Sequence, residues 1–519
     1  MIITIALAYV GLLFAIASHG DRVSRSGAVP FSRPLIYALS LGIYCTSWTF
    51  FGSVGLSARS GFDFLPIYIG PILIVVFAPR LIQAVVRISK RQNITSIADF
   101  ISARYGKNQL LGALVAIIAM IGVVPYIALQ LKAVSGALQV MINVPGGQPG
   151  FTGLQTSDEL ALAVTIAMAA FAWAFGTRHS DATEHQDGMI LAVAVESIVK
   201  LVSFIAVGAF VTFVMMGGPG EIIRQINDMP ELRDVFTRPV DPMSWITMTL
   251  LSMFAIILLP RQFHVMVVEN RSPDDVRMAR WLFPAYLVAI NLFVVPVAAA
   301  GLLMFGTANG GDGFVLAIPV AENASTVAII AFLGGLSAAT AMVIVETVAL
   351  AVMICNNVVL PLVLRRERVG MRDMGRLIIG IRRAVIVAVL ALAFTYFEVL
   401  GAQVALAQIG LISFAAIAQF APAFFMGLIW RRGTAAGAMA GILAGFAMWT
   451  HTLILPSLAQ AGFIREGFVS QGPFGISWLR PEHMFGVELD ALSHGVLWSL
   501  AANLIVFFAV SMARAPSAV

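Results

Sequence analysis

Two polar stretches lie inside apolar segments, and they are the first candidates for chemistry. One is Tyr-Cys-Thr-Ser-Trp at 44–48, with glycines before and after it; the other is Leu-Leu-Pro-Arg-Gln-Phe-His at 258–264. Unsatisfied polar groups in hydrocarbon cost several kcal/mol. A proline inside a helix removes one hydrogen bond and frees a carbonyl. Each stretch therefore indicates either close helix packing or a broken helix that lines a cavity.

Charged residues inside apolar segments are the next candidates. Glu196 and Lys200 lie four residues apart and share one helical face, so their spacing favours a neutralising pair. Lys132 either faces a cavity or extends its ammonium to the membrane surface. Glu346 lies in a long apolar run, where an ionised carboxylate is expensive. An ion pair between Glu346 and a basic neighbour such as Lys132 is one interpretation.

The composition excludes a soluble protein. Of the 519 residues, 59% are hydrophobic and only 11% are charged, with a mean hydropathy of +0.92; a soluble domain is about a quarter charged. The net charge of +5 lies almost wholly in loops, so it reports membrane topology rather than nucleic-acid binding. Cys45 and Cys355 lie in apolar spans and are poor candidates for a disulfide or a metal site. We predict no metal or organic cofactor and no catalytic motif, hence no enzyme.

The elements that must position these residues are membrane helices. About thirteen apolar runs have the length that a bilayer requires. They are Ile2–Ser18, Pro34–Ser57, Leu65–Val86, Leu110–Ile142, Leu160–Trp173, Met189–Met216, Trp245–Leu259, Trp281–Phe305, Ser325–Leu364, Arg383–Tyr396, Val404–Trp430, Ala435–Leu455 and Leu492–Met512. The sequence therefore predicts an all-α polytopic membrane protein.

Basic residues give the predicted orientation. Arginines and lysines gather after the first, third, ninth and eleventh runs, whereas the loops 143–158 and 306–323 have none. Basic loops stay in the cytoplasm. We therefore expect a multi-pass protein of a bacterial-type cytoplasmic (inner) membrane, with the N-terminus outside and the C-terminus in the cytoplasm. This arrangement requires an odd number of helices.

The runs also divide into two blocks of five. We expect residues 1–519 to form a single transmembrane domain, with helix one at 2–18, repeat one at 34–216, repeat two at 245–430, and helices twelve and thirteen at 435–512. Five is odd, so the two blocks have opposite topology, as inverted-repeat transporters require. The two polar stretches then interrupt the first helix of each block. Broken helices at equivalent positions indicate a binding site near the middle of the membrane.

Several motifs resemble those of the sodium/solute symporter family. They are Ile94–Gly106, Val124–Gln130, Gln408–Gly410, Phe420–Pro422, Trp430 and Gly433–Gly445. A narrower resemblance, to the transporter domain of CbrA-type sensor histidine kinases, lies in Gly176–His185, Leu259–Asn270 and Gly335–Val345. No His-box helix or Gly-rich ATP lid follows the last run. The sequence leaves open a split gene product, a longer chain and a stand-alone transporter.

The resemblance implies a LeuT-like fold in which the second and ninth helices hold a coupling ion. Its ligands are then the carbonyls of Gly42 and Cys45, together with Met342, Val345 and Glu346. Hard cations need oxygen donors, and the side chain of Val345 offers none. A glutamate at a sodium position binds a proton instead. We therefore expect a coupling ion, H⁺ rather than Na⁺, at Glu346, with the ion pair to a basic neighbour as the alternative.

Candidate substrate-binding residues come from three helices. They are Tyr44, Ser47 and Trp48 on the second helix, Tyr126 and Gln130 on the fourth, and Pro260 on the seventh. Half-helix ends offer free amides to a carboxylate, and aromatic rings stack on planar groups. For each aromatic residue, ordinary helix packing is the alternative. The resemblance also puts the small residues Ser252 and Ile256 where the proline symporter has aromatic rings, which predicts a wider site.

These observations favour a secondary active transporter that works by alternating access. Its solute is a small organic molecule, and we expect an amino acid such as histidine. The resemblance also implies a cytoplasmic histidine kinase module as a partner, with the transporter as its sensory input. The alternative is a solute receptor that signals to such a kinase without transport.

Overall fold

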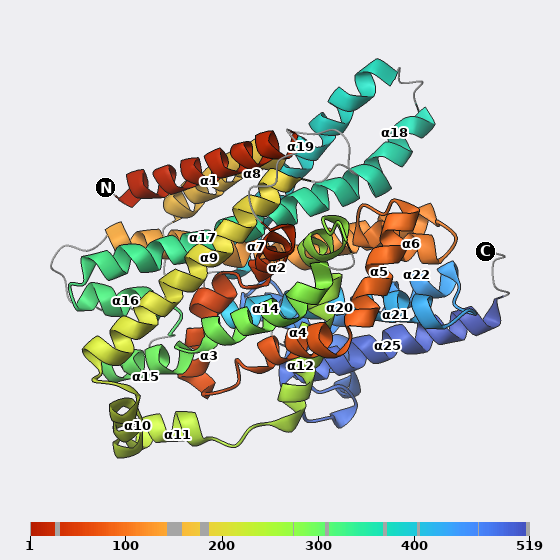
Figure 1. Ribbon diagram of the computed structural model, residues 1–519. Coiled ribbons are helices and arrows are strands. Elements are labelled where there is room, and N and C mark those ends of the chain that lie inside the picture. Colours follow the sequence, from red (N-terminus) through yellow and green to blue (C-terminus); the bar gives the residue numbers. More distant parts are fainter. Residues whose placement is uncertain are drawn as a thin grey trace.

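The computed structural model of the chain is almost entirely helical (Figure 1). It describes residues 2–25, 32–142, 158–176, 186–272, 275–306, 311–366, 371–401, 405–465 and 467–514. Parts of the expected loops 143–158 and 306–323, most of the motif Gly176–His185 and the last five residues lie outside these ranges.

Nine helical stretches in the described residues are long and apolar enough to cross a membrane. They are α1 (Ile2–Arg25), α7 (Gln109–Ile142), α9 (Asp187–Ala209), α14 (Asp275–Asn291) with α15 (Val294–Phe305), α17 (Ser325–Ile354), α19 (Met371–Tyr396), α20 (Leu406–Ala418) with α21 (Ala421–Ile429), α22 (Ala435–Trp449) and α25 (Ala491–Ala513).

Three bent helix pairs raise this number to as many as twelve. They are α2 (Arg33–Ser40) with α3 (Ser53–Ser60), α4 (Pro66–Phe77) with α5 (Pro79–Gln92), and α11 (Pro230–Thr237) with α12 (Pro242–Leu258), bent by 62°, 75° and 60°. The remaining predicted run lies on α8 (Asp158–Gly176). The prediction of a polytopic helical membrane protein is confirmed.

The first predicted interruption separates α2 from α3. After α2 the chain forms one 3₁₀ turn, Leu41–Tyr44, and Cys45 then adopts an extended conformation with φ −81° and ψ 102°. A π-helical turn at Trp48–Gly52 restores the helix. The hydroxyl of Thr46 accepts a hydrogen bond from the amide of Trp48 at 3.2 Å, which replaces one lost main-chain bond. We call Leu41–Ser47 the first break.

The second predicted interruption follows α12. Leu259 is extended, with φ −62° and ψ 133°, and Pro260 opens the short helix α13 (Pro260–Phe263). Proline suits the first position of a helix, because its missing amide has no intrahelical partner there. A π-helical turn, His264–Val268, continues the chain. We call Leu259–Pro260 the second break.

One predicted run differs from the structure. Leu65–Val86 is predicted as one membrane-spanning run, and the structure divides it into α4 and α5 at Ala78. Pro79 follows directly, and a proline both disfavours helical geometry in the residue before it and starts a new helix well. The stretch after α9 likewise holds two short helices, α10 (Pro219–Asp228) and α11, where only a loop was expected.

Two long helices form the centre of the bundle. In the most apolar part of α17, 78% of the residues are buried, and in that of α7 67% are buried. In α1 and α25 the buried share is only 17% and 28%. The central helix α17 packs against α7 and α9, and α4 packs against α12. Figure 1 shows α1 and α8 along one side of the bundle and α25 along the other. The turn Leu41–Tyr44 of the first break packs against α9 and α17, and α13, which follows the second break, packs against α17. Both breaks therefore lie against interior helices.

Candidate functional site

The first break directs two main-chain carbonyls at one ammonium group. Nζ of Lys200, on α9, donates hydrogen bonds to the carbonyl oxygens of Gly42 at 3.1 Å and Cys45 at 2.7 Å. Lys200 is fully buried. The two carbonyls expected to bind a coupling ion thus converge on a cation, and that cation is a side chain of the protein itself.

Glu196 lies one turn before Lys200, but it has other hydrogen-bond partners. Its carboxylate accepts a hydrogen bond from the hydroxyl of Thr340 on α17, and its main-chain carbonyl accepts one from Ser337 at 2.9 Å. Glu196 and Lys200 therefore lie on adjacent turns, as expected, but their hydrogen bonds go to other groups. The two side chains interact electrostatically while each makes its hydrogen bonds with a different helix.

The second break places an arginine inside the protein. Nη1 of Arg261, the residue after Pro260, donates to the carboxylate of Glu346 at 2.7 Å, and both side chains are fully buried. The guanidinium carbon also lies 4.6 Å from the ring centre of Tyr126. Among the described residues, Nε and Nη2 of Arg261 have no hydrogen-bond partner. The basic partner of Glu346 is thus Arg261, where the sequence suggested Lys132.

The other residues expected at the ion site are Met342 and Val345. Both are fully buried on α17, within one turn of Glu346. Neither side chain carries an oxygen. Glu346, paired with Arg261, is therefore the polar member of this group.

Helix α7 is joined to the first break by hydrogen bonds. The hydroxyls of Tyr126 and Thr46 lie 2.9 Å apart, and Oε1 of Gln130 accepts a bond from the amide of Ser47 at 3.1 Å. Nε2 of Gln130 donates to the carbonyl of Tyr126 at 3.2 Å. The hydroxyl of Ser47 is buried without a hydrogen-bond partner among the described residues. Tyr126 also contacts Arg261, so one side chain links the two breaks.

Two predicted substrate residues point to other helices. The hydroxyl of Tyr44 donates to the carbonyl of Ile67 on α4 at 2.8 Å. The indole nitrogen of Trp48 donates to the carbonyl of Ala407 on α20 at 3.1 Å. Of the predicted residues, the structure therefore brings Ser47, Tyr126 and Gln130 together beside the residue that follows Pro260.

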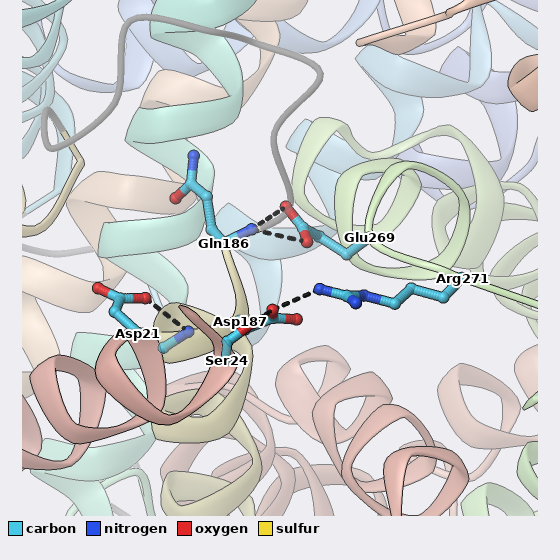
Figure 2. Close-up of polar contacts among 7 residues, drawn as sticks. Asp21, Ser24, Gln186, Asp187, Glu269 and Arg271 are labelled. Carbon is cyan, nitrogen blue, oxygen red and sulfur yellow. Dashed lines mark hydrogen bonds and ion pairs between the residues drawn. The ribbon is translucent and has the colours of Figure 1, made fainter. Parts of the chain in front are cut away.

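A second polar group lies where α1 ends and α9 begins, as Figure 2 shows; we call it the Asp187 cluster. It consists of Asp21, Ser24, Gln186, Asp187, Glu269 and Arg271. Asp187 accepts from Ser24 and pairs with Arg271, Asp21 accepts from the amide of Gly188 at 2.9 Å, and Glu269 accepts from the amide of Gln186. An open pocket of about 650 Å³ borders this cluster.

The described residues contain no group of three or more His, Cys, Asp or Glu side chains arranged to hold a metal ion. The chemistry at the breaks is therefore that of hydrogen bonds and ion pairs: carbonyls around an ammonium, and a guanidinium with free donors beside a carboxylate.

Comparison with a protein family bears on the first break. Residues 34–146 match the sodium:solute symporter family. The matched stretch contains the first break and Tyr126 and Gln130 of α7, and it ends before Lys200 and Arg261.

Two longer similarities cover most of the chain. It is 23% identical to the uncharacterised symporter YhjB of Bacillus subtilis (strain 168), over 84% of this chain and 85% of the relative. Its structure resembles that of a Na⁺-coupled sialic acid symporter in a substrate-bound outward-open state, with a TM-score of 0.69 and 14% identity, covering 100% of this chain and 98% of the other. The chain has a LeuT-like fold, and these similarities support a multi-pass membrane transporter of the symporter type rather than an enzyme.

Proposed function

We propose that the protein is a secondary active transporter of a small organic solute that bears a carboxylate, an amino acid such as histidine being the leading candidate. Alternating access would proceed by movement of the helices at the two breaks. The observation that carries this proposal is Arg261, which is fully buried beside the second break with two of its three nitrogens lacking a hydrogen-bond partner among the described residues.

A carboxylate satisfies these free donors. The guanidinium is a planar fork that binds carboxylates through two parallel hydrogen bonds. One nitrogen already contacts Glu346, and the face of the group lies against the ring of Tyr126, which restricts its orientation. The buried hydroxyl of Ser47, on the first break, supplies a further polar group on the side of α7. The proposed solute is therefore an anion or zwitterion.

Binding of the solute would also account for proton coupling. A carboxylate on Nε and Nη2 of Arg261 would share the guanidinium charge with Glu346, which holds Nη1. Two buried carboxylates on one guanidinium would be costly in a membrane. Uptake of one proton by Glu346 removes one of these negative charges, so the solute and the proton bind together and leave together. We propose protons, rather than sodium, as the coupling ion on this basis.

The test is uptake of radiolabelled histidine into proteoliposomes under an imposed proton or sodium gradient. We expect uptake to follow the proton gradient and to be lost in Glu346→Gln, which cannot exchange a proton. Arg261→Lys should weaken apparent affinity at least tenfold, because an ammonium cannot form the two parallel bonds. Glu221→Gln, on the exposed face of α10, serves as the matched control. Uptake that follows sodium and survives in Glu346→Gln would overturn the coupling proposal.

A receptor is the second candidate. The ion pair of Arg261 with Glu346 already neutralises the site, and Lys200 already satisfies the carbonyls of the first break, so solute binding alone can shift the conformational equilibrium. A cytoplasmic histidine kinase would read that shift. Saturable histidine binding without gradient-driven accumulation would favour this candidate. Both candidates place the C-terminus in the cytoplasm of a bacterial-type inner membrane, which labelling of single cysteines from either side can test.

A further inference from the structure

The carbonyls of the first break form a place for a cation. The 3₁₀ turn Leu41–Tyr44 ends at the extended residue Cys45, whose amide donates to the carbonyl of Gly42 at 3.0 Å, and the helix continues no further. The carbonyl end of a helix carries a partial negative charge. In broken membrane helices, such unwound carbonyls coordinate small cations. A cation here is therefore expected from the backbone geometry alone.

The structure supplies that cation from α9. The ammonium of Lys200 lies 2.7 Å from the carbonyl oxygen of Cys45 and 3.1 Å from that of Gly42, with no solvent exposure. A buried ammonium is expensive unless hydrogen-bonded, and two carbonyls at these distances meet that requirement. The cation thus gains two acceptors. The carbonyl of Cys45 gains a charged donor, and that of Gly42 gains a second donor beside the amide of Cys45.

Close packing of the first break on α9 makes this contact possible. A Cβ atom on Gly42 would lie 2.8 Å from Oγ and 3.0 Å from Cβ of Ser197, so only glycine allows this approach. Ser197 lies three residues before Lys200 and shares its face of α9. Tyr286 of α14 donates to the carbonyl of Ser197 at 2.9 Å, which holds the same turn from the other side.

Neighbouring groups balance the charge. The groups that act electrostatically on the ammonium are Cys45 in the break, Glu196 on α9 and Arg261 on α13. Glu196 is held by Thr340 of α17 and lies one turn before Lys200. An acidic group on the adjacent turn can balance the ammonium without a free ion.

We propose that Lys200 is a built-in cation that takes the place of a free metal cation at the first break. The carbonyls of Gly42 and Cys45 are then satisfied in every molecule, and sodium has no role at this position. The inference deepens the proposed function by naming what occupies the break in a cycle driven by another gradient. It concerns cation binding, however, and can be tested without transport.

The experiment measures the melting temperature of the purified full-length protein in detergent. Choline, sodium and methylammonium chloride are compared at equal ionic strength, for the wild type and for Lys200→Ala, Lys200→Met and Lys132→Met. The alanine variant leaves space at the carbonyls, the methionine variant fills that space without a charge, and Lys132→Met removes another buried lysine as the matched control. A cation that binds only the folded state raises the melting temperature.

We expect the melting temperature of the wild type to be the same in all three salts. The melting temperature of Lys132→Met should likewise not change among the salts. Lys200→Ala should melt several degrees lower than the wild type in choline and recover in sodium or methylammonium, whereas Lys200→Met should melt lower in all three. Stabilisation of the wild type by sodium would overturn the proposal. So would a Lys200→Met variant as stable as the wild type, or a Lys200→Ala variant that neither cation restores. Each outcome is independent of whether the protein transports histidine.

Discussion

Two of the pairs of an arginine with an acidic residue in the described part of the chain differ in burial. Arg261 and Glu346, at the second break, have no exposed side-chain surface, whereas Arg271 and Asp187, in the Asp187 cluster, are 32% and 33% exposed. A buried ion pair rarely stabilises a protein more than apolar residues of the same size would. An exposed pair costs little and contributes little. The buried pair therefore requires a functional explanation, and the exposed pair does not.

The two regions also differ in what holds them. Asp21 of the Asp187 cluster accepts from the amide of Gly188 in the first turn of α9, where an acidic side chain complements the positive end of a helix. This bond fastens the end of α1 to α9. The buried groups depend on carbonyls and donors that the breaks release inside the protein. The comparison indicates that the Asp187 cluster fastens helix ends together, whereas the two breaks hold the polar groups that we propose act on a solute.

Arg261→Ala tests the buried region most severely, because it leaves Glu346 buried without its partner. We expect a loss of about 3–5 kcal/mol in stability. The double variant Arg261→Met, Glu346→Leu should recover most of that loss, since both charges are then absent. Thermal melting of the single and double variants measures the coupling. If the loss of stability in the double variant equalled the sum of the losses in the two single variants, the two side chains would not depend on each other.

Gly42→Ala should have the next largest effect, because the new methyl group meets Ser197 on α9. Overpacking of this kind costs about 1–3 kcal/mol. Gly52→Ala is the matched control in the same interrupted helix: its Cβ would lie 3.4 Å from the nearest atom, an ordinary contact. Chemical denaturation or thermal melting distinguishes them. Equal effects at both glycines would contradict the close approach at Gly42.

Tyr126→Phe removes the hydroxyl that contacts Thr46 and keeps the ring against Arg261. We expect a loss of about 0.5–1.5 kcal/mol, the usual net value of one hydrogen bond. Thr46→Val should cost more, because it also removes the acceptor of the Trp48 amide, and the double variant should lose little more than Thr46→Val alone. Additive losses, measured by the same melting experiment, would exclude a direct bond between the two hydroxyls.

Asp187→Asn should have the smallest effect, because its pair with Arg271 is partly exposed. We expect a change of about 0–1 kcal/mol that shrinks as salt is added. The loss in Arg261→Ala should persist at the same salt concentration, since solvent ions do not screen a fully buried pair. A salt series of melting temperatures for both variants checks this directly. Similar salt dependence in both would remove the distinction between the two regions.

The sequence predicted the breaks because they depend on residue types. Small and hydroxyl residues at 44–48 and a proline at position 260 are unusual in apolar helices, and the structure interrupts the helix at both places. The bend at Ala78 also had a signal, in Pro79, but Leu65–Val86 was interpreted as one apolar run. The division into repeats at 34–216 and 245–430 stays a prediction.

The site was harder to predict because every residue has a main-chain carbonyl, and the residue type does not show which carbonyls bind a cation. The spacing of Glu196 and Lys200 favours a local pair, and nothing in the sequence shows that two carbonyls 155 and 158 residues away attract the ammonium more directly. Arg261 had an available signal, as a charged residue beside a helix-breaking proline in an apolar segment. From the sequence, Arg261 was interpreted as part of the proline stretch at 258–264, and Lys132 was suggested as the partner of Glu346.

The ammonium of Lys200 is attached to the chain, and this has a consequence for the salt concentrations at which the protein can work. A cation tethered to the chain meets its carbonyls at an effective concentration that the fold sets, whatever the medium contains. The contact of Lys200 with Gly42 and Cys45 therefore forms equally well in fresh water and in brine. In the proposed arrangement, external salinity alters neither the occupancy of the first break nor the affinity that depends on it.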